Sequence, residues 1–560
     1  MSSAPGDPAP GSVDAKAHIA GRVNISKHGD DYSDRRYLPV CLDPSSEVPN
    51  GVLRRFSSST YHNNNPIQTS SRIANMGFKV IIVGGSVSGL SLANMLEKFN
   101  IEYILLEAHS KIAPQLGASM GLLPGGLRIL DQLGCYDRVR EIVGDCCYYQ
   151  PSLRLFNGKI LDKEKPKTFS EQLEYRTGYP QIFIDRQMLL QILFDNIQSK
   201  DRVMTRKRVV RVETAENHVR VHTQDGCAYT GDIVVGADGV HSAVRKEMWR
   251  NGVESDPGSF RPDEDKALAA DSKCIFGISQ RPKSLPASAL QINAFFDRRN
   301  YMMLSAPGDR LYWFMFQDMD RTTGSDIPRF TTEDEVNLAK KHFEDQVTAS
   351  TTFGDVYENR LQTALVSLEE HVFSRWYFRR IITIGDAAHK VHPNTAQGGN
   401  GAIETSAVLL NTLLRRLDDT SELSERDIED VFSKVQTNRF ARAANALEQG
   451  RHTSSISTRD TFSSRIFVHY LLPWFGDRII MWLAVKHAET GPVIERLPVP
   501  KRHGIILPHG STVKKPQSLK VALGFGAFGA TLVAVLLYFT RGSTRAISFA
   551  TLFRGHLGHL

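Results

Sequence analysis

Cysteine is scarce in this sequence, which has six cysteines among 560 residues and no CxxC pair. A chain of this length can bury a core without covalent cross-links, so a small disulfide-rich scaffold is excluded and reduced thiols are expected.

Clusters of metal ligands are missing as well. His389 and His392 lie three residues apart, but no third ligand lies near them in the sequence. A zinc site takes at least three protein ligands, so no metal is expected.

A strong excess of charge is also missing. Lysine and arginine number 68 and aspartate and glutamate 61, which leaves a net charge of +7. No basic block and no basic stripe interleaved with aromatic residues occurs, so nucleic acid is not expected as a partner. Hydrophobic residues at 41% and charged residues at 23% are typical of globular proteins. These values exclude fibrous, wholly disordered and multi-span channel chains.

Only one long apolar run stands out, Val521–Phe539, with 19 residues and no charge. As a helix it crosses roughly 28 Å of hydrocarbon, so we predict one transmembrane helix over residues 519–540, with a buried core helix as the alternative. More Lys and Arg precede the run than follow it, which predicts a single-pass protein with its body in the cytosol. A second apolar stretch, Ile466–Val485, contains charges and a proline, as in an amphipathic helix on a membrane or in a core.

The first nucleotide-binding signal is a strand, a tight turn and a helix. Phe78 to Val83 is a β-branched run, and the residues after it change at once to helical spacing. Gly84 permits the turn and Gly89 permits close packing of the helix, whose free N–H groups suit a pyrophosphate. Glu107 ends the next strand, where a carboxylate binds ribose hydroxyls and repels a 2′-phosphate. The segment therefore predicts FAD or NAD rather than NADP.

Two further motifs favour a flavin. DIVVGADGVHSAVR is a strand that runs into Asp238 before a helix start. Asp238 is a candidate cofactor-binding residue, with a plain helix cap as the alternative. ITIGDAAHKVHPNTAQGGNG is a strand that ends at Asp386, followed by a loop and by Gly398, Gly399 and Gly401 at the start of a second helix. Asp386 can hydrogen-bond a ribityl hydroxyl, and glycines at a helix N-terminus let a flat ring approach the backbone N–H groups.

The three motifs, in this order, resemble the FAD-dependent monooxygenases of the para-hydroxybenzoate hydroxylase class. Within that class, GASMGLLPGGLRILDQLG, CIFGIS and ERLPVPKR are similar to the fungal epoxidases of paxilline-type indole-diterpene and meroterpenoid pathways. The resemblance implies FAD contacts at Glu107, Gly121, Arg186, Asp386 and Gly399. One departure is Ala396, where the family pattern has glycine; alanine fits there if its φ is negative.

The implied fold is α/β, a Rossmann-like FAD-binding domain interleaved with a β-sheet substrate domain, plus a helical C-terminal region and the transmembrane helix. The expected parts are a disordered extension over 1–76, the FAD-binding domain over 77–270 and 370–450, the substrate sheet over 271–369, and the helical region over 451–515. The sequence gives no oligomeric state.

The resemblance implies reduction of FAD by NADPH or NADH, reaction with O₂ to a C4a-hydroperoxide, and oxygen transfer to an alkene. Aromatic, alternating segments between Cys274 and Phe316 suit an apolar ligand over a sheet, and Tyr301 is the candidate for a catalytic hydroxyl. The main hypothesis is epoxidation of an isoprenoid chain on a lipophilic terpenoid or meroterpenoid precursor. An aromatic hydroxylase of the same class and a non-catalytic nucleotide-binding membrane protein are the alternatives.

Overall fold

The computed structural model describes residues 77–113, 119–161, 167–261, 263–420, 422–459 and 461–502. The predicted extension over 1–76 lies outside these residues.

The structure corrects the predicted membrane topology. Within the described residues, no helix is both long enough and apolar enough to cross a bilayer. The predicted span, 519–540, lies outside the part of the chain that the structure describes. The described residues therefore do not support the predicted transmembrane helix or a single-pass membrane location.

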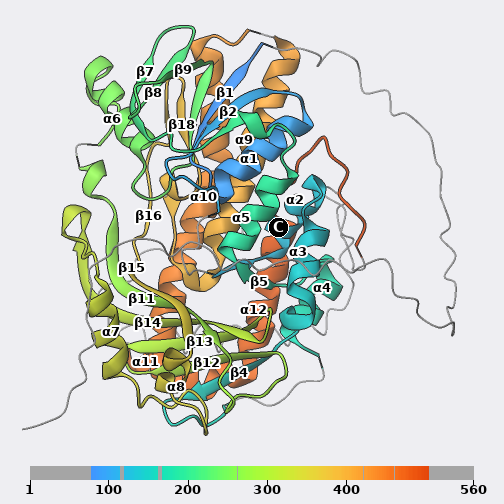
Figure 1. Ribbon diagram of the computed structural model, residues 1–560, viewed down its shortest axis with the longest axis vertical. Helices are drawn as coiled ribbons and strands as arrows, with labels where there is room; N and C mark the ends of the chain where they lie inside the picture. The colour runs from blue at the N-terminus through green and yellow to red at the C-terminus, as the bar shows by residue number, and fades with distance from the viewer. Residues whose placement is uncertain are drawn as a thin grey trace, which may run out of the picture. The chain divides into compact units, whose positions relative to one another are not determined.

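The first sheet has six strands in the order β17-β18-β10-β1-β2-β6 (Figure 1). All its pairs are parallel except β17 with β18. The central strands are almost fully buried, which explains their continuous apolar sequences. The strands are β1 Lys79–Val83, β2 Glu102–Leu106, β6 Val203–Met204, β10 Ile233–Gly236, β17 Tyr377–Phe378 and β18 Ile381–Thr383.

Helices cover one face of this sheet, and a small sheet with one helix covers the other. The helices of the first face are α1 Val87–Lys98, α2 Pro124–Leu133, α3 Tyr136–Val143, α5 Arg186–Asn196, α9 Gln397–Asp419 and α10 Glu425–Ser457. The second face carries β7 Val209–Thr214, β8 Val219–Thr223, β9 Ala228–Gly231 and α6 Ala243–Ser255.

The second sheet also has six strands, in the order β15-β11-β14-β13-β12-β4. Its pairs are antiparallel except β12 with β4. The strands are β4 Gln150–Leu155, β11 Ala269–Gln280, β12 Leu290–Phe296, β13 Arg299–Ala306, β14 Arg310–Thr323 and β15 Arg360–Ser367. β4 comes from the stretch of chain that precedes the predicted substrate sheet, so both sheets draw on that stretch.

The two faces of the second sheet carry different side chains, because successive strand residues alternate. Tyr301, Trp313 and Met315 pack in one cluster with α7 Thr332–Lys341 and α8 Phe353–Glu358. Cys274, Tyr312 and Phe314 lie in a second cluster on the opposite face. This second face is the one that meets the nucleotide-binding half of the molecule, through β3 Ser119–Leu122 and β5 Ile182–Asp185.

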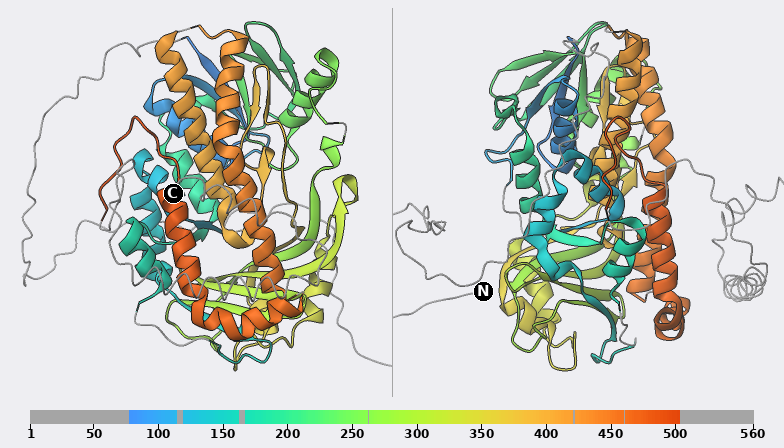
Figure 2. Two further views of the ribbon diagram at one scale, coloured as in Figure 1. Left: turned by 180° about the vertical axis from the view of Figure 1, so that it is seen from behind. Right: turned by 90° about the vertical axis from the view of Figure 1, so that its right-hand side faces the viewer.

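C-terminal helices connect the two sheets. Near its start, α10 contacts β17 of the first sheet, and Thr458 just after α10 accepts a hydrogen bond from the Arg298 N–H beside β13. Figure 2 shows α10 running between the two regions from behind. α11 Phe462–Ile466 and α12 Leu472–Glu489 follow, with a π-helical turn between them, and α12 packs on α4 Phe169–Thr177 and on α2.

Candidate functional site

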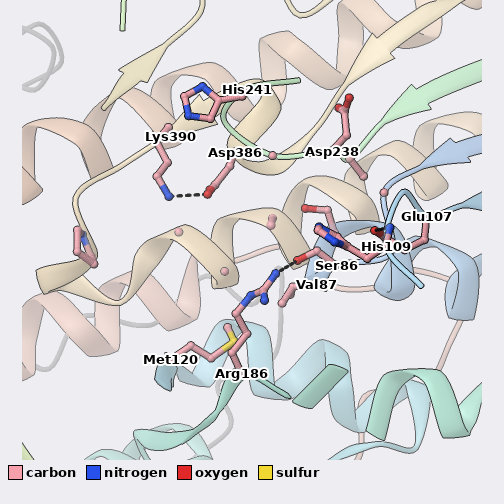
Figure 3. Close-up of a pocket in the computed structure, with 18 of the residues that line it drawn as sticks. Ser86, Val87, Glu107, His109, Met120, Arg186, Asp238, His241, Asp386 and Lys390 are labelled. Atoms are coloured by element: carbon pink, nitrogen blue, oxygen red, sulfur yellow. Dashed lines mark hydrogen bonds and ion pairs between the residues drawn. The ribbon is translucent and has the colours of Figure 1, made fainter. Parts of the chain in front are cut away.

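A cavity of about 530 Å³ lies where the carboxyl ends of β1, β2 and β10 face the second sheet. Val83, Leu106 and Ala237 border it on the side of the parallel strands, and Phe314 borders it from β14. In open α/β sheets, ligands bind at the carboxyl ends of the strands, where neighbouring connections diverge. Figure 3 shows polar side chains from several distant segments converging on this space.

Two helices begin at the cavity. Ser86 and Val87 at the start of α1 line it, and so do Gly398 and Gly399 at the start of α9. Neither helix has a side-chain cap at its N-terminus. The first N–H groups of a helix have no partner within the helix, so both ends can bind anionic or carbonyl oxygens.

Glu107 follows β2 and holds its carboxylate in place through backbone donors. Its Oε2 accepts from the Gly85 N–H at 2.6 Å and its Oε1 from the His109 N–H at 2.7 Å. The residue is 9% exposed and lines the cavity. A fixed, buried carboxylate at the end of β2 suits the two hydroxyls of a ribose.

Arg186 begins α5 and points toward α1, as Figure 3 shows. Its Nη2 donates to Ser86 Oγ at 2.8 Å. Burial lowers the pKa of Arg186, and the carboxylates of Asp386 and Glu107 oppose that shift. An arginine stays charged under these conditions, so a cation lies beside the start of α1.

Asp386 lies in the short turn after β18, opposite Arg186 across the cavity. Its Oδ2 accepts from Lys390 Nζ at 2.6 Å, and both residues line the cavity (Figure 3). The Lys390 ammonium therefore fixes the Asp386 carboxylate from one side and leaves the other oxygen available to a ligand.

The predicted glycines lie where a side chain has no room. Gly84 has φ +106, and a Cβ there would meet the Ala237 carbonyl oxygen at 2.5 Å. A Cβ at Gly89 would lie 2.0 Å from the Gly84 carbonyl oxygen, so close helix packing needs this glycine even though it does not line the cavity. A Cβ at Gly399 would meet the Met120 methyl group at 2.3 Å.

Ala396 departs from the expectation of a negative φ. It is the N-cap of α9 and adopts φ 56 and ψ 17, the left-handed region. Its methyl group leaves no room above Gly121, where a Cβ would lie 2.6 Å from Ala396 Cβ. The loop therefore follows the course that a glycine would take, and alanine bears the strain.

Comparisons with known proteins identify the family. A family model described as an FAD binding domain matches residues 77–425. The FAD-dependent monooxygenase ausM of Penicillium brasilianum is 36% identical over 429 residues, which cover 76% of this chain and 88% of that protein. The FAD-dependent monooxygenase spyC of Aspergillus fumigatus is 39% identical over 407 residues, 71% of this chain and 84% of that protein. This chain belongs to the FAD-dependent monooxygenases.

Solved structures show the same fold. HpxO of Klebsiella pneumoniae, complexed with FAD and uric acid, has a TM-score of 0.60 at 21% identity and covers 75% of this monooxygenase and 100% of its own chain. The tetracycline destructase Tet(51) has a TM-score of 0.54 at 16% identity, covering 76% and 99%. The α/β fold expected from the sequence is thus supported, and FAD is the cofactor of this family.

The predicted residue Asp238 lines the cavity and also caps a helix of the monooxygenase. The half-buried Asp238 carboxylate caps α6, accepting from Ser242 Oγ at 2.5 Å and from the Ala243 and Val244 N–H groups. Burial raises the pKa of Asp238, and these hydrogen bonds oppose the shift. Asp238 lines the cavity, but its carboxylate is engaged by the helix.

Tyr301 lies away from the cavity. It is fully buried on the α7–α8 face of the second sheet, and its hydroxyl donates to Asp345 Oδ2 at 2.5 Å. Its ladder partner on β14 is Met315, whereas the cavity-lining Phe314 pairs with Met302. Alternation along the strand therefore places Tyr301 on the opposite face of the sheet from the cavity-lining Met302 and Phe314.

Several cavity residues were not predicted. Lys390 lies four residues after Asp386, a spacing that could have indicated the ion pair. Phe183, two residues before Asp185, has no sequence signal that separates it from an ordinary core residue. The remaining charged or titratable lining residues not predicted are His109, Lys207, Arg208 and His241.

Among the described residues, no group of three potential ligands could hold a metal ion.

Proposed function

We propose that this FAD-dependent monooxygenase epoxidises an isoprenoid alkene on a lipophilic small molecule, with NADPH or NADH as the electron donor. The nicotinamide gives a hydride, solvent gives one proton, and one O₂ then supplies the epoxide oxygen and the oxygen of one water. The resemblance to fungal terpenoid and meroterpenoid epoxidases supports this substrate class.

The observation that carries the proposal is the chemistry of the substrate-side wall. The second sheet contributes Phe276, Met302 and Phe314 to the lining of the cavity, and all three side chains are apolar. Phe183 from β5 extends the same surface, with its ring 6.4 Å from Phe314 between centroids. A phenol hydroxylase gains from a base that forms the phenolate, whereas an alkene needs only an apolar surface. The described lining on this sheet therefore favours an alkene.

We assign the cofactor contacts from the opposite wall. Glu107 would bind the ribose hydroxyls, Arg186 and the start of α1 the pyrophosphate, and Asp386 the ribityl chain. Gly398 and Gly399 would face the flavin at the start of α9. The fit has a structural basis: a Cβ added at Gly398 has its nearest atoms 3.9 Å away, so the backbone there borders open space.

When bound, FAD supplies the redox chemistry, namely acceptance of two electrons and activation of O₂. The chain's own residues bind and orient the cofactor and the substrate, and they exclude water. The α9 N-terminus would favour negative charge on a bound flavin, since the helix dipole is positive at that end. The aromatic wall would exclude water from the site, which limits side reactions.

The donor nicotinamide is expected to bind transiently. The strand, turn and helix at β1 and α1 form one dinucleotide fold, which the FAD assignment uses. Among the described residues, the second helix that begins at the cavity is α9, and we assign the N-terminus of α9 to the flavin ring. A donor would therefore reach the flavin through the same cavity.

The proposal is tested by the rate at which NADPH or NADH bleaches the flavin absorbance. Purified enzyme is mixed with donor alone, with an isoprenoid-bearing precursor, and with a phenol lacking that chain. Faster bleaching and an epoxide product with the isoprenoid compound support the proposal. Stimulation and oxygenation of the phenol alone would instead identify an aromatic hydroxylase.

A further inference from the structure

A buried carboxylate next to Arg186 connects the two walls of the cavity. Asp185 is 2% exposed. Its Oδ2 accepts from Tyr312 Oη at 2.7 Å and from Arg310 Nη2 at 2.9 Å, and its Oδ1 accepts from Arg310 Nη1 at 3.2 Å. Both donors belong to β14 of the second sheet, 125 and 127 residues further along the chain.

The position of Asp185 makes this arrangement unusual. It is the last residue of β5 and the N-cap of α5, where aspartate commonly accepts a hydrogen bond from the helix. Its side chain makes no cap hydrogen bond here. The carboxylate instead binds β14, so the start of α5 is fixed by the substrate-side sheet.

Each end of this connection borders the cavity. Arg186, the next residue after Asp185, lines the cavity and donates to Ser86 at the start of α1. Tyr312 lies two residues before Phe314 on the same sheet face, and Phe314 lines the cavity. A continuous path of bonds therefore runs from the apolar wall through Tyr312, Asp185 and Arg186 to the α1 turn.

We propose that Asp185, held by Tyr312 and Arg310, is a positioning residue that fixes Arg186 against the cofactor. The inference rests on the proposed contact of Arg186 with FAD and assigns the support of that contact to the substrate-side sheet. Without Asp185, β14 would no longer constrain the backbone from which the Arg186 side chain extends. The guanidinium would then sample orientations that do not meet the cofactor.

The second sheet offers a matched control of the same chemistry. Asp345 accepts from Tyr301 Oη at 2.5 Å and from Arg299 at 2.7 and 2.8 Å. This triad also joins a carboxylate, a buried tyrosine and an arginine of one strand, but it lies on the α7–α8 side of the sheet. Asp345→Asn removes an equivalent charge and leaves the cavity untouched.

The test measures the FAD dissociation constant of apo-enzyme by flavin fluorescence in four variants and the wild type. Asp185→Asn should weaken FAD binding about tenfold and change the visible flavin spectrum, while Asp345→Asn should change neither. Arg186→Gln should weaken binding by itself. In the Arg186→Gln background, Asp185→Asn should then raise the FAD dissociation constant by less than a further twofold. The free-energy effects of independent substitutions add, whereas those of coupled substitutions do not.

Several outcomes would overturn the inference. An equal tenfold effect of Asp185→Asn in both backgrounds would show that Asp185 does not act through Arg186. The same loss in Asp345→Asn would indicate a general structural effect, and unchanged affinity in Arg186→Gln would remove the premise. Tyr312→Phe, which deletes one hydroxyl, serves if Asp185→Asn does not fold, with an expected smaller loss of affinity. Because no substrate is used, failure of the epoxidation proposal leaves this result unaffected.

Discussion

At the scale of single residues, the cavity combines fixed charges with one strained backbone position. Glu107 is fixed by backbone donors, Arg186 by Ser86, and Asp386 by Lys390. Each charge therefore has one defined orientation before a cofactor arrives. Preorganised groups of this kind lose little conformational freedom on binding, which favours affinity.

Asp386→Ala should weaken FAD binding by roughly tenfold or more, because a hydrogen bond to a charged group contributes about 1.5–3 kcal/mol. The variant also leaves the Lys390 ammonium without its partner. FAD occupancy of the purified protein, measured from its absorbance, checks the result. Asp430→Ala is the matched control, since Asp430 and Lys434 form an exposed pair with the same four-residue spacing and the same 2.6 Å distance. Full occupancy in Asp386→Ala would contradict the assigned role.

Ala396→Gly should stabilise the protein by about 0.5–1 kcal/mol, since glycine adopts positive φ without the steric cost that alanine bears. The greater freedom of glycine in the unfolded chain offsets part of the gain. Urea unfolding measures the change. A loss of stability would mean that the Ala396 methyl group contributes more through packing than it costs through strain.

At the scale of elements, a buried ion cluster ties α9 to α10 and α12. Glu404 of α9 is 1% exposed and accepts from Arg439 Nη1 and from Arg442 Nε and Nη2, each at 2.7 Å. Burial raises the pKa of Glu404, but the two arginines outweigh it and lower the pKa to about 2. His487 of α12 accepts from Arg442 Nη2 at 2.7 Å. The cluster therefore holds the helix whose N-terminus reaches the cavity.

Glu404→Gln should lower the free energy of unfolding by about 3–5 kcal/mol, because it leaves the buried Arg439 and the half-buried Arg442 without their counter-charge. Glu495→Gln, which removes an exposed partner of Arg415, should cost less than about 1 kcal/mol. Chemical denaturation of both variants provides the comparison. Equal costs at the two positions would contradict the structural importance of the cluster.

The sequence predicts where helices and strands form better than it predicts which face of a strand carries a given side chain. The β1 turn and α1 follow from local residues, because periodicity and Gly84 act within a few positions. The sequence pattern does not reveal that Tyr301 lies on the face away from the cavity, because the face of a strand residue depends on register with strands far along the chain. Asp185 gave no signal for the same reason: its partners on β14 are brought to it only by tertiary packing. The left-handed φ of Ala396 depends on the course of a whole loop. The membrane prediction is corrected because no described helix is long and apolar enough to cross a bilayer.

At the scale of the whole molecule, three buried histidines and one half-buried histidine, His487, predict how stability changes with pH. Burial lowers the pKa of His342, His389, His392 and His487 to about 4. In the unfolded chain, histidine has a pKa of about 6.5. Between these values the unfolded state binds more protons, so stability falls as the pH decreases from about 6.5 to about 4.

The free energy of unfolding should therefore decrease by up to about 1.4 kcal/mol per pH unit for each buried histidine in this window. His487→Gln keeps an acceptor for Arg442. It should reduce the slope of unfolding free energy against pH by the contribution of one histidine. His452→Gln is the control variant, because the His452 side chain is 65% exposed. Urea titrations at several pH values measure these slopes. A slope that is the same in all three proteins would contradict the assignment for His487.

One measurement tests the central claim most directly: the mass and structure of the product formed from an isoprenoid-bearing precursor under ¹⁸O₂ with NADPH. The account predicts one ¹⁸O atom in the product, an epoxide at a former double bond, and a dependence on added or bound FAD. An oxygenated ring with the double bonds intact, or a product without ¹⁸O, would contradict it.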